Sequence, residues 1–84
     1  MYTHIAISRH LSVDGTTTFY VIEKSKNSSS IIWNGTCKQA AYQVAYRNAR
    51  KESTPLYDTL YKAEVDRNGV KHIIPIGNEL LEVN

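Results

Sequence analysis

Apolar and polar residues alternate along most of the first 24 positions, which is the pattern of half-buried β-strands. In the first run, residues 3–13, one parity is apolar: Ile5, Ile7, Leu11 and Val13. A second run, residues 16–24, is rich in β-branched and aromatic side chains. Asp14 and Gly15 separate the two runs. Both residue types tolerate a positive φ, so the sequence predicts a hairpin closed by a two-residue turn.

The predicted turn determines the register of this hairpin and therefore the faces of its strands. With two residues in the turn, Ile7 lies opposite Ile22, and one face collects six side chains: Ile5, Ile7, Leu11, Val13, Tyr20 and Ile22. The other face carries Ala6, Phe19 and Val21. That face is unusually apolar for contact with water, so we expect a homodimer whose interface includes Phe19 and Val21.

Residues 36–51 show a helical period. Small side chains, most of them apolar, recur three or four residues apart and form one stripe: Cys37, Ala40, Ala41, Val44, Ala45, Asn48 and Ala49. A lone thiol in such a stripe favours a buried position for Cys37. Thr36 followed by Gln39 fits a capping box at the start of the helix, and Pro55 is expected to stop it.

The other segments predict strands and turns. A polar connector at residues 25–30 precedes a short strand at 31–33, and strands at 56–65 and 70–76 flank a turn at 66–69. The chain order is three strands, a helix and two strands (β-β-β-α-β-β). We therefore expect an α+β fold, an antiparallel sheet with one helix packed on one face. At 84 residues, the whole of 1–84 is expected to form one domain.

The outer face of the predicted helix interleaves tyrosines with cations. Lys38, Tyr42, Tyr46 and Arg50 are spaced four apart and form one ridge. Cations neutralise phosphates and tyrosines stack on bases, so the ridge has the composition of a platform for single-stranded nucleic acid. The predicted RNA-binding residues are Lys38, Tyr42, Tyr46, Arg47, Arg50 and Lys51, with Lys24 and Lys26 extending the patch. The alternative is an ordinary solvated helix face.

The overall charge is compatible with this interpretation without demanding it. The net charge is +2, and four carboxylates fall in the last quarter of the chain: Glu64, Asp66, Glu79 and Glu82. A basic middle and an acidic end favour one anion-binding side over a uniformly basic surface. No apolar run reaches the ~18 residues that cross a bilayer, so we expect no membrane contact and a cytoplasmic location in a host cell.

Catalytic and metal-binding patterns do not occur in the sequence. His4, His10 and His72 lie far apart and lack the spacing of zinc ligands, and the single cysteine cannot form a disulfide within the chain. No phosphate-binding glycine loop or nucleophile elbow is found. We therefore expect no cofactor, no metal and no enzymatic activity.

Three features carry a resemblance to a known group of proteins. They are the helix entry Asn34-Gly35-Thr36, the alanine-spaced helix with Ala41, Val44, Ala45 and Ala49, and the hairpin turn at Asp66–Gly69. With its small size and its composition, the chain resembles accessory proteins of T-even-type phages, among them inhibitors of a host RNase toxin. The resemblance implies a protein that binds RNA and sequesters a host toxin together with it.

Two other functions remain open at this point. The tyrosines are also suitable anchors for a protein interface, so the chain is alternatively an inhibitor of a host defence complex, similar to anti-CRISPR proteins, that binds no nucleic acid. The third interpretation is a structural or assembly accessory protein.

Overall fold

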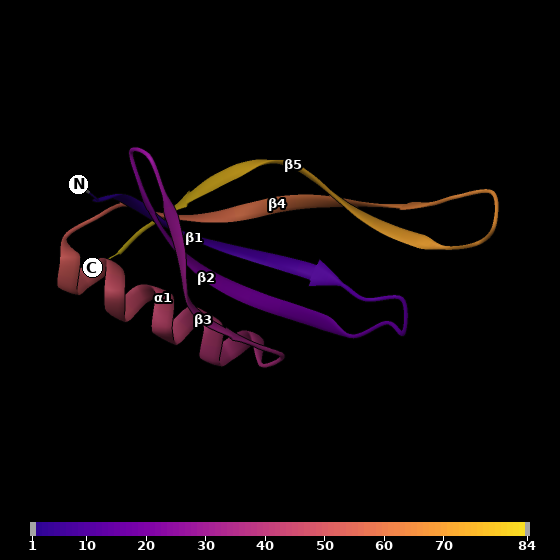
Figure 1. The fold of residues 1–84 in the computed structure, drawn as a ribbon, viewed down its shortest axis with the longest axis horizontal. Helices are drawn as coiled ribbons and strands as arrows, with labels where there is room; N and C mark the ends of the chain where they lie inside the picture. The colour runs from indigo at the N-terminus through magenta and orange to yellow at the C-terminus, as the bar shows by residue number, and fades with distance from the viewer. Residues whose placement is uncertain (1, 84) are drawn as a thin grey trace.

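The alternating segments form five strands of one sheet, and the alanine-rich segment forms a helix on one of its faces (Figure 1). This computed structural model describes residues 2–83, and the side chains of residues 4–83. The elements are β1 (Tyr2–Leu11), β2 (Thr17–Ser25), β3 (Ser29–Gly35), α1 (Lys38–Glu52), β4 (Leu56–Val65) and β5 (Lys71–Leu81). The predicted α+β fold with one helix is confirmed.

The sheet is mixed, so the prediction of a purely antiparallel sheet is wrong. In space the strands follow the order β3-β2-β1-β4-β5, and β1 and β4 run parallel to each other. Their ladder is short, with Ile5 opposite Leu56 and Ile7 opposite Asp58 at its ends. The physical reason is the helix, which carries the chain back so that β4 enters the sheet beside β1 in the same direction. Parallel neighbours need such a crossover.

The turn between β1 and β2 contains three residues instead of the predicted two. The Ser12 amide donates to the Thr16 carbonyl over 2.8 Å, which leaves residues 13–15 as the loop. Gly15 adopts a φ of 91°, the left-handed conformation that closes three-residue loops. The extra residue moves the register by one position, so Ile7 lies opposite Val21 and Arg9 opposite Phe19.

This register overturns the predicted dimer interface. Phe19 is 6% exposed and Val21 is fully buried, because both point toward the helix. They belong to a core of eight side chains: Ile5, Ile7, Phe19, Val21, Ala41, Ala45, Ala49 and Leu56. A side chain buried within one chain has no surface left for a second chain, so the prediction that Phe19 and Val21 form an interface is wrong.

The helix packs on the sheet through the predicted stripe. Ala41, Ala45 and Ala49 are buried, and their small size lets the backbone of α1 lie close to the strands. The start of the helix differs from prediction, because Cys37 occupies the N-cap position without a side-chain cap bond and is exposed. The predicted capping box at Thr36 and the predicted burial of Cys37 are therefore wrong. At the other end, Ser53 has a left-handed φ of 53° and terminates the helix.

Beyond the short β1–β4 ladder the two hairpins separate. The β1–β2 and β4–β5 hairpins extend past the helix as two arms (Figure 1). The molecule measures 44 × 23 × 23 Å, and its radius of gyration is 13.8 Å. A compact domain of this length has a radius of gyration of about 12 Å. The chain is therefore elongated, with much of its sheet outside the helix-covered core.

Candidate nucleic-acid interface

The predicted ridge on α1 is present and consists of two cation–tyrosine pairs. The Lys38 ammonium lies 5.8 Å from the centre of the Tyr42 ring, and the Arg50 guanidinium lies 6.0 Å from the centre of the Tyr46 ring. Both tyrosines are half-buried and pack against the edge of the core. The cations thus rest on aromatic surface that their own helix provides.

A shallow groove of about 620 Å³ runs along this side of the helix. Six side chains line it: Gln39, Tyr42, Gln43, Tyr46, Arg47 and Arg50. Four of these are among the predicted RNA-binding residues, and the two glutamines add hydrogen-bonding amides. The lining contains cations, amides and aromatic rings but no carboxylate.

The positive charge of the molecule is concentrated on this helix. Residues 38–52 contain four cations and one carboxylate, a net charge of +3, whereas the whole chain is +2, so the remaining residues sum to −1. Within the described residues 2–83, none of the four cations forms an ion pair. An unpaired cation keeps its full attraction for an anionic ligand.

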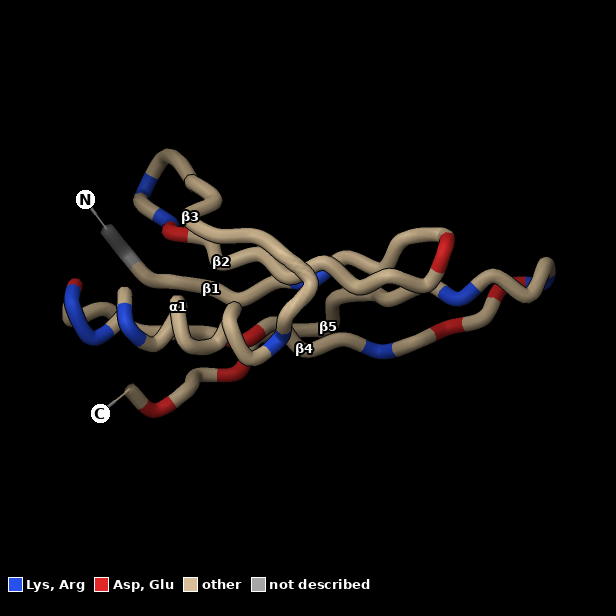
Figure 2. Tube along the Cα trace, turned by 90° about the horizontal axis from the view of Figure 1, so that it is seen from below, with Lys and Arg blue, Asp and Glu red and all other residues tan. Residues whose placement is uncertain are grey.

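The other predicted residues lie outside the groove. Lys51 is exposed in the last turn of the helix but does not line the groove. Lys24 lies at the end of β2 opposite His4, on the sheet face away from the helix, and Lys26 follows in the β2–β3 turn. Figure 2 shows that turn at the end of the molecule where the helix ends, separated from the helix. The structure therefore does not bring Lys24 and Lys26 together with the ridge.

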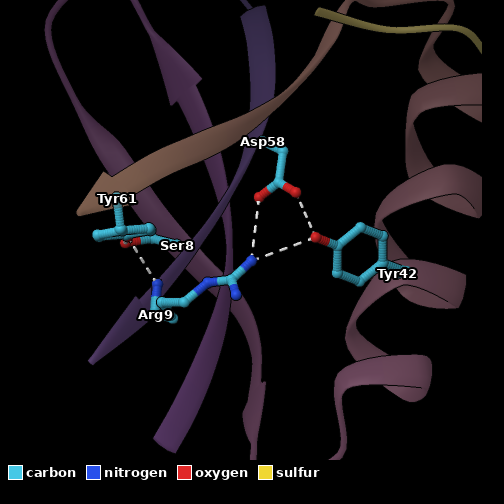
Figure 3. Close-up of polar contacts among 5 residues, drawn as sticks. All are labelled: Ser8, Arg9, Tyr42, Asp58 and Tyr61. Atoms are coloured by element: carbon cyan, nitrogen blue, oxygen red, sulfur yellow. Dashed lines mark hydrogen bonds and ion pairs between the residues drawn. The ribbon is translucent and has the colours of Figure 1, made fainter. Parts of the chain in front are cut away.

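Carboxylates border the groove without lining it. The acidic C-terminal segment runs beside the helix (Figure 2). Glu79 pairs across the ladder with Asp58, whose carboxylate accepts a hydrogen bond from the Tyr42 hydroxyl (Figure 3). In the β4–β5 hairpin, Lys62 lies 2.7 Å from Glu64 and His72 lies 2.9 Å from Asp66. Lys62 and Asp66 thus each have a partner within the hairpin, whereas the helix cations have no carboxylate partner within residues 2–83.

Tyr42 is held in place by two charged residues (Figure 3). Its hydroxyl donates a hydrogen bond to Asp58 Oδ2 and accepts one from Arg9 Nη2 at 3.3 Å. Burial raises the pKa of Tyr42 to about 12, and the hydrogen bond to Asp58 and its negative charge act in the same direction. The hydroxyl end of Tyr42 is therefore fixed, and its ring forms a rigid wall of the groove.

Arg9 is the central residue of this network, and its partners were not predicted from the sequence. Its guanidinium lies 5.1 Å from the Phe19 ring centre and 5.5 Å from that of Tyr61, and 3.5 Å from Asp58 Oδ1. The Arg9 and Asp58 side chains are only 23% and 14% exposed. Arg9 alternates in step with Ile5 and Ile7 along β1. This alternation was the sequence signal that could have placed the Arg9 side chain on the core side of the sheet.

Tyr61 completes this network from β4. Its hydroxyl accepts a hydrogen bond from the Arg9 backbone amide at 2.9 Å and lies 3.0 Å from the Ser8 hydroxyl (Figure 3). The four residues Arg9, Tyr42, Asp58 and Tyr61 thus connect the helix groove to both hairpins. Their hydroxyls, Arg9 Nη2 and Asp58 Oδ2 are hydrogen-bonded within the network, whereas Arg9 Nε and Asp58 Oδ1 are buried without a hydrogen-bond partner in the described residues.

Comparisons of the chain with protein-family models, with curated proteins and with solved structures found no match. In residues 2–83, α1 is the one helix, and it is neither long nor apolar enough to cross a membrane. The same residues contain no group of three or more histidine, cysteine, aspartate or glutamate side chains placed to hold a metal ion. The groove of α1 is therefore the feature of the molecule from which a function can be inferred.

Proposed function

We propose that this protein is a non-enzymatic RNA-binding protein that holds single-stranded RNA along the outer side of α1. One observation carries the proposal. The groove is lined by two tyrosines, two arginines and two glutamines, and the four cations of the helix have no carboxylate partner within residues 2–83. Cations without carboxylate partners beside partly exposed aromatic rings have the composition of a sequence-tolerant RNA site.

In the proposed mechanism, cations of the helix provide affinity for the RNA backbone, and tyrosine rings provide surface on which bases or riboses pack. Lys38, Arg47 and Arg50 neutralise phosphates, which releases counterions and makes binding salt-dependent. Tyr42 and Tyr46 offer ring surface for bases or riboses. Because Arg9 and Asp58 fix the hydroxyl of Tyr42, that ring is pre-positioned and loses little freedom on binding.

A charge reversal with a matched control tests the site. The triple variant Lys38→Glu, Arg47→Glu, Arg50→Glu is compared with Lys62→Glu, Arg67→Glu, Lys71→Glu, which changes the charge equally on the β4–β5 hairpin. In filter binding to single-stranded RNA, the first variant is expected to lose binding and the second to retain most of it. Three neutralised phosphates imply roughly a 20-fold loss of affinity between 50 and 200 mM salt for the wild type. Equal losses in both variants would show that the helix is not the site.

In a host cell we propose that the protein acts in the cytoplasm and neutralises a defence factor such as an RNase toxin, with RNA held between the two proteins. Pull-down from toxin-expressing cells, with and without nuclease treatment, tests this step. Loss of the toxin after nuclease treatment supports an RNA bridge. Retention of the toxin, together with purified protein that carries no nucleic-acid absorbance, would instead identify a protein-only inhibitor.

A further inference from the structure

Both glutamines of the chain lie in the α1 groove. Gln39 and Gln43 are the only glutamines in the sequence, and both line the groove. Their side chains are exposed, and neither amide makes a hydrogen bond within the part of the chain that the structure describes. Uncharged amides are not what holds phosphates, because cations do this. The two amides are therefore available for contact with bases.

The groove side chains form two parallel rows along the helix. One row is Tyr42, Tyr46 and Arg50, and the other is Gln39, Gln43 and Arg47. Within the rows, Gln39 precedes Tyr42 by three positions, and Gln43 precedes Tyr46 by three. Residues at this spacing are neighbours on a helix surface. Each tyrosine thus has one glutamine beside it, and the two tyrosine–glutamine pairs lie about 6 Å apart along the helix axis.

The tyrosine rings leave surface free toward the groove. The Lys38 ammonium lies over the Tyr42 ring, 5.8 Å from its centre, but Lys38 does not line the groove. The ring surface of Tyr42 that lines the groove therefore stays free, and the hydrogen bonds of its hydroxyl hold the ring in place (Figure 3). The one ring–ring contact among residues 4–83 is between His4 and Tyr57, so Tyr42 and Tyr46 do not stack on each other.

A glutamine amide has a hydrogen-bond donor beside an acceptor in one plane. Adenine presents the complementary combination on both of its open edges, because its N6 amino group lies between the acceptors N1 and N7. Guanine presents two acceptors, N7 and O6, which match arginine instead. A pyrimidine offers the amide such a pair on one edge only, and its single ring gives less surface for stacking on tyrosine.

We propose that Gln39 and Gln43 make the groove selective for adenine in single-stranded RNA. Each amide pairs with an adenine whose ring packs on the neighbouring tyrosine, so the groove holds two adenines of one strand. The cations hold the backbone whatever the sequence, and the amides supply the discrimination between bases. This inference rests on the proposed RNA function and names the base that the same groove prefers.

Competition binding with oligo(A), oligo(U) and oligo(C) of equal length, at one salt concentration, tests the selectivity. The wild type is expected to bind oligo(A) about tenfold more tightly than either pyrimidine oligomer, toward the lower end of the discrimination usual for one bidentate pair. The double variant Gln39→Met, Gln43→Met keeps the side-chain length and the net charge but removes both amides, so its preference for oligo(A) should disappear. Asn78→Met is the matched control, since it exchanges an exposed amide on β5 and should keep the preference.

Equal affinity of the wild type for the three oligomers overturns the selectivity and leaves the proposed RNA function standing, whereas absence of binding to all three at low salt overturns both. A preference that the double variant retains also overturns the selectivity.

If the double variant fails to fold by circular dichroism, nuclear magnetic resonance of the wild type decides. The side-chain amide signals of Gln39 and Gln43 are the only glutamine signals of the chain, and they should shift with oligo(A) much more than with oligo(U). Equal shifts with both oligomers, or no shift with oligo(A), overturn the proposal.

Discussion

The backbone amide of Arg9 donates a hydrogen bond to the hydroxyl of Tyr61 across 2.9 Å, beyond the last backbone pair between their strands. The β1–β4 ladder ends at Ile7 and Asp58. From there a tyrosine hydroxyl takes the place of a backbone carbonyl, and it meets Ser8 at 3.0 Å as well. Side-chain bonds therefore hold the two hairpins together where the main chain no longer does.

Tyr61→Phe removes the acceptor for the Arg9 amide and keeps the ring. We expect the free energy of unfolding to fall by about 1 kcal/mol, the net value of a typical hydrogen bond. Urea denaturation measures this loss. Amide hydrogen exchange gives a local readout, because the Arg9 amide should exchange faster in the variant.

Tyr20→Phe is the control for this experiment. The Tyr20 hydroxyl makes no hydrogen bond within the described residues, and the side chain lies on the sheet face away from the helix. Its removal is expected to change stability by less than about 0.5 kcal/mol. If Tyr61→Phe is equally mild and the Arg9 amide stays protected, the proposed attachment of β4 through Tyr61 is wrong.

A double-mutant cycle measures the coupling energy between Arg9 and Asp58. Removing one partner leaves a largely buried charge without its counterpart. Arg9→Met and Asp58→Asn are therefore each expected to cost about 2–4 kcal/mol. The double variant should lose less than the sum, with a coupling of at least about 1 kcal/mol. Strictly additive losses in thermal or urea unfolding would mean that the two residues act independently.

We expect the Tyr42 hydroxyl to lose its proton at a higher pH than a typical tyrosine. Its pKa is raised from 10.0 to about 12, so the folded state holds the phenol proton more tightly than the unfolded state. The resulting stabilisation is fully present below pH 10 and is lost as the pH rises from 10 to 12. The phenolate absorbance of the wild type minus that of Tyr42→Phe should show a step near pH 12. A step near pH 10 would mean that the burial of Tyr42 and its contact with Asp58, which raise the pKa, do not persist in solution.

Gly35 is required by the close approach of Trp33. A β-carbon built on Gly35 would lie 3.0 Å from the Trp33 ring, so Gly35→Ala forces the indole to move. We expect a shift in tryptophan fluorescence and a loss of about 1–3 kcal/mol, as for other overpacked sites. Trp33 is the single tryptophan of the chain, so the emission reports on this site alone. Gly69→Ala is the comparison: there no atom lies near the new β-carbon and the strain comes from a φ of 79°, so stability should fall without a change in emission.

The helix and its two faces were predictable because their signals are local. The stripe at Ala41, Ala45 and Ala49 follows from a period of 3.6 residues, and the buried side of α1 agrees with it. The ridge of Lys38, Tyr42, Tyr46 and Arg50 followed from the same period. The hydrogen bonds of the Tyr42 hydroxyl were not predictable, because its partners Arg9 and Asp58 are 33 and 16 residues away in the sequence.

The hairpin faces were not predictable from Asp14 and Gly15 alone. The same two residues fit a two-residue turn or the end of a three-residue loop, and the structure has the latter. Because side chains alternate, one extra loop residue exchanged the faces of β2 and moved Phe19 and Val21 into the core. The parallel entry of β4 beside β1 was also hidden, since chain order does not state which strands become neighbours.

The short β1–β4 ladder has a consequence for how the chain folds. Each hairpin closes locally, whereas the pairing of Ile5 with Leu56 joins residues about 50 positions apart. Bringing such distant segments together costs chain entropy, and this cost arises before the contacts that offset it have formed. Docking of β4 onto β1 should therefore be the rate-limiting step, and the β4–β5 hairpin should be the first unit to detach during unfolding. The hydrogen bond between the Arg9 amide and the Tyr61 hydroxyl is then expected to act mainly by slowing unfolding.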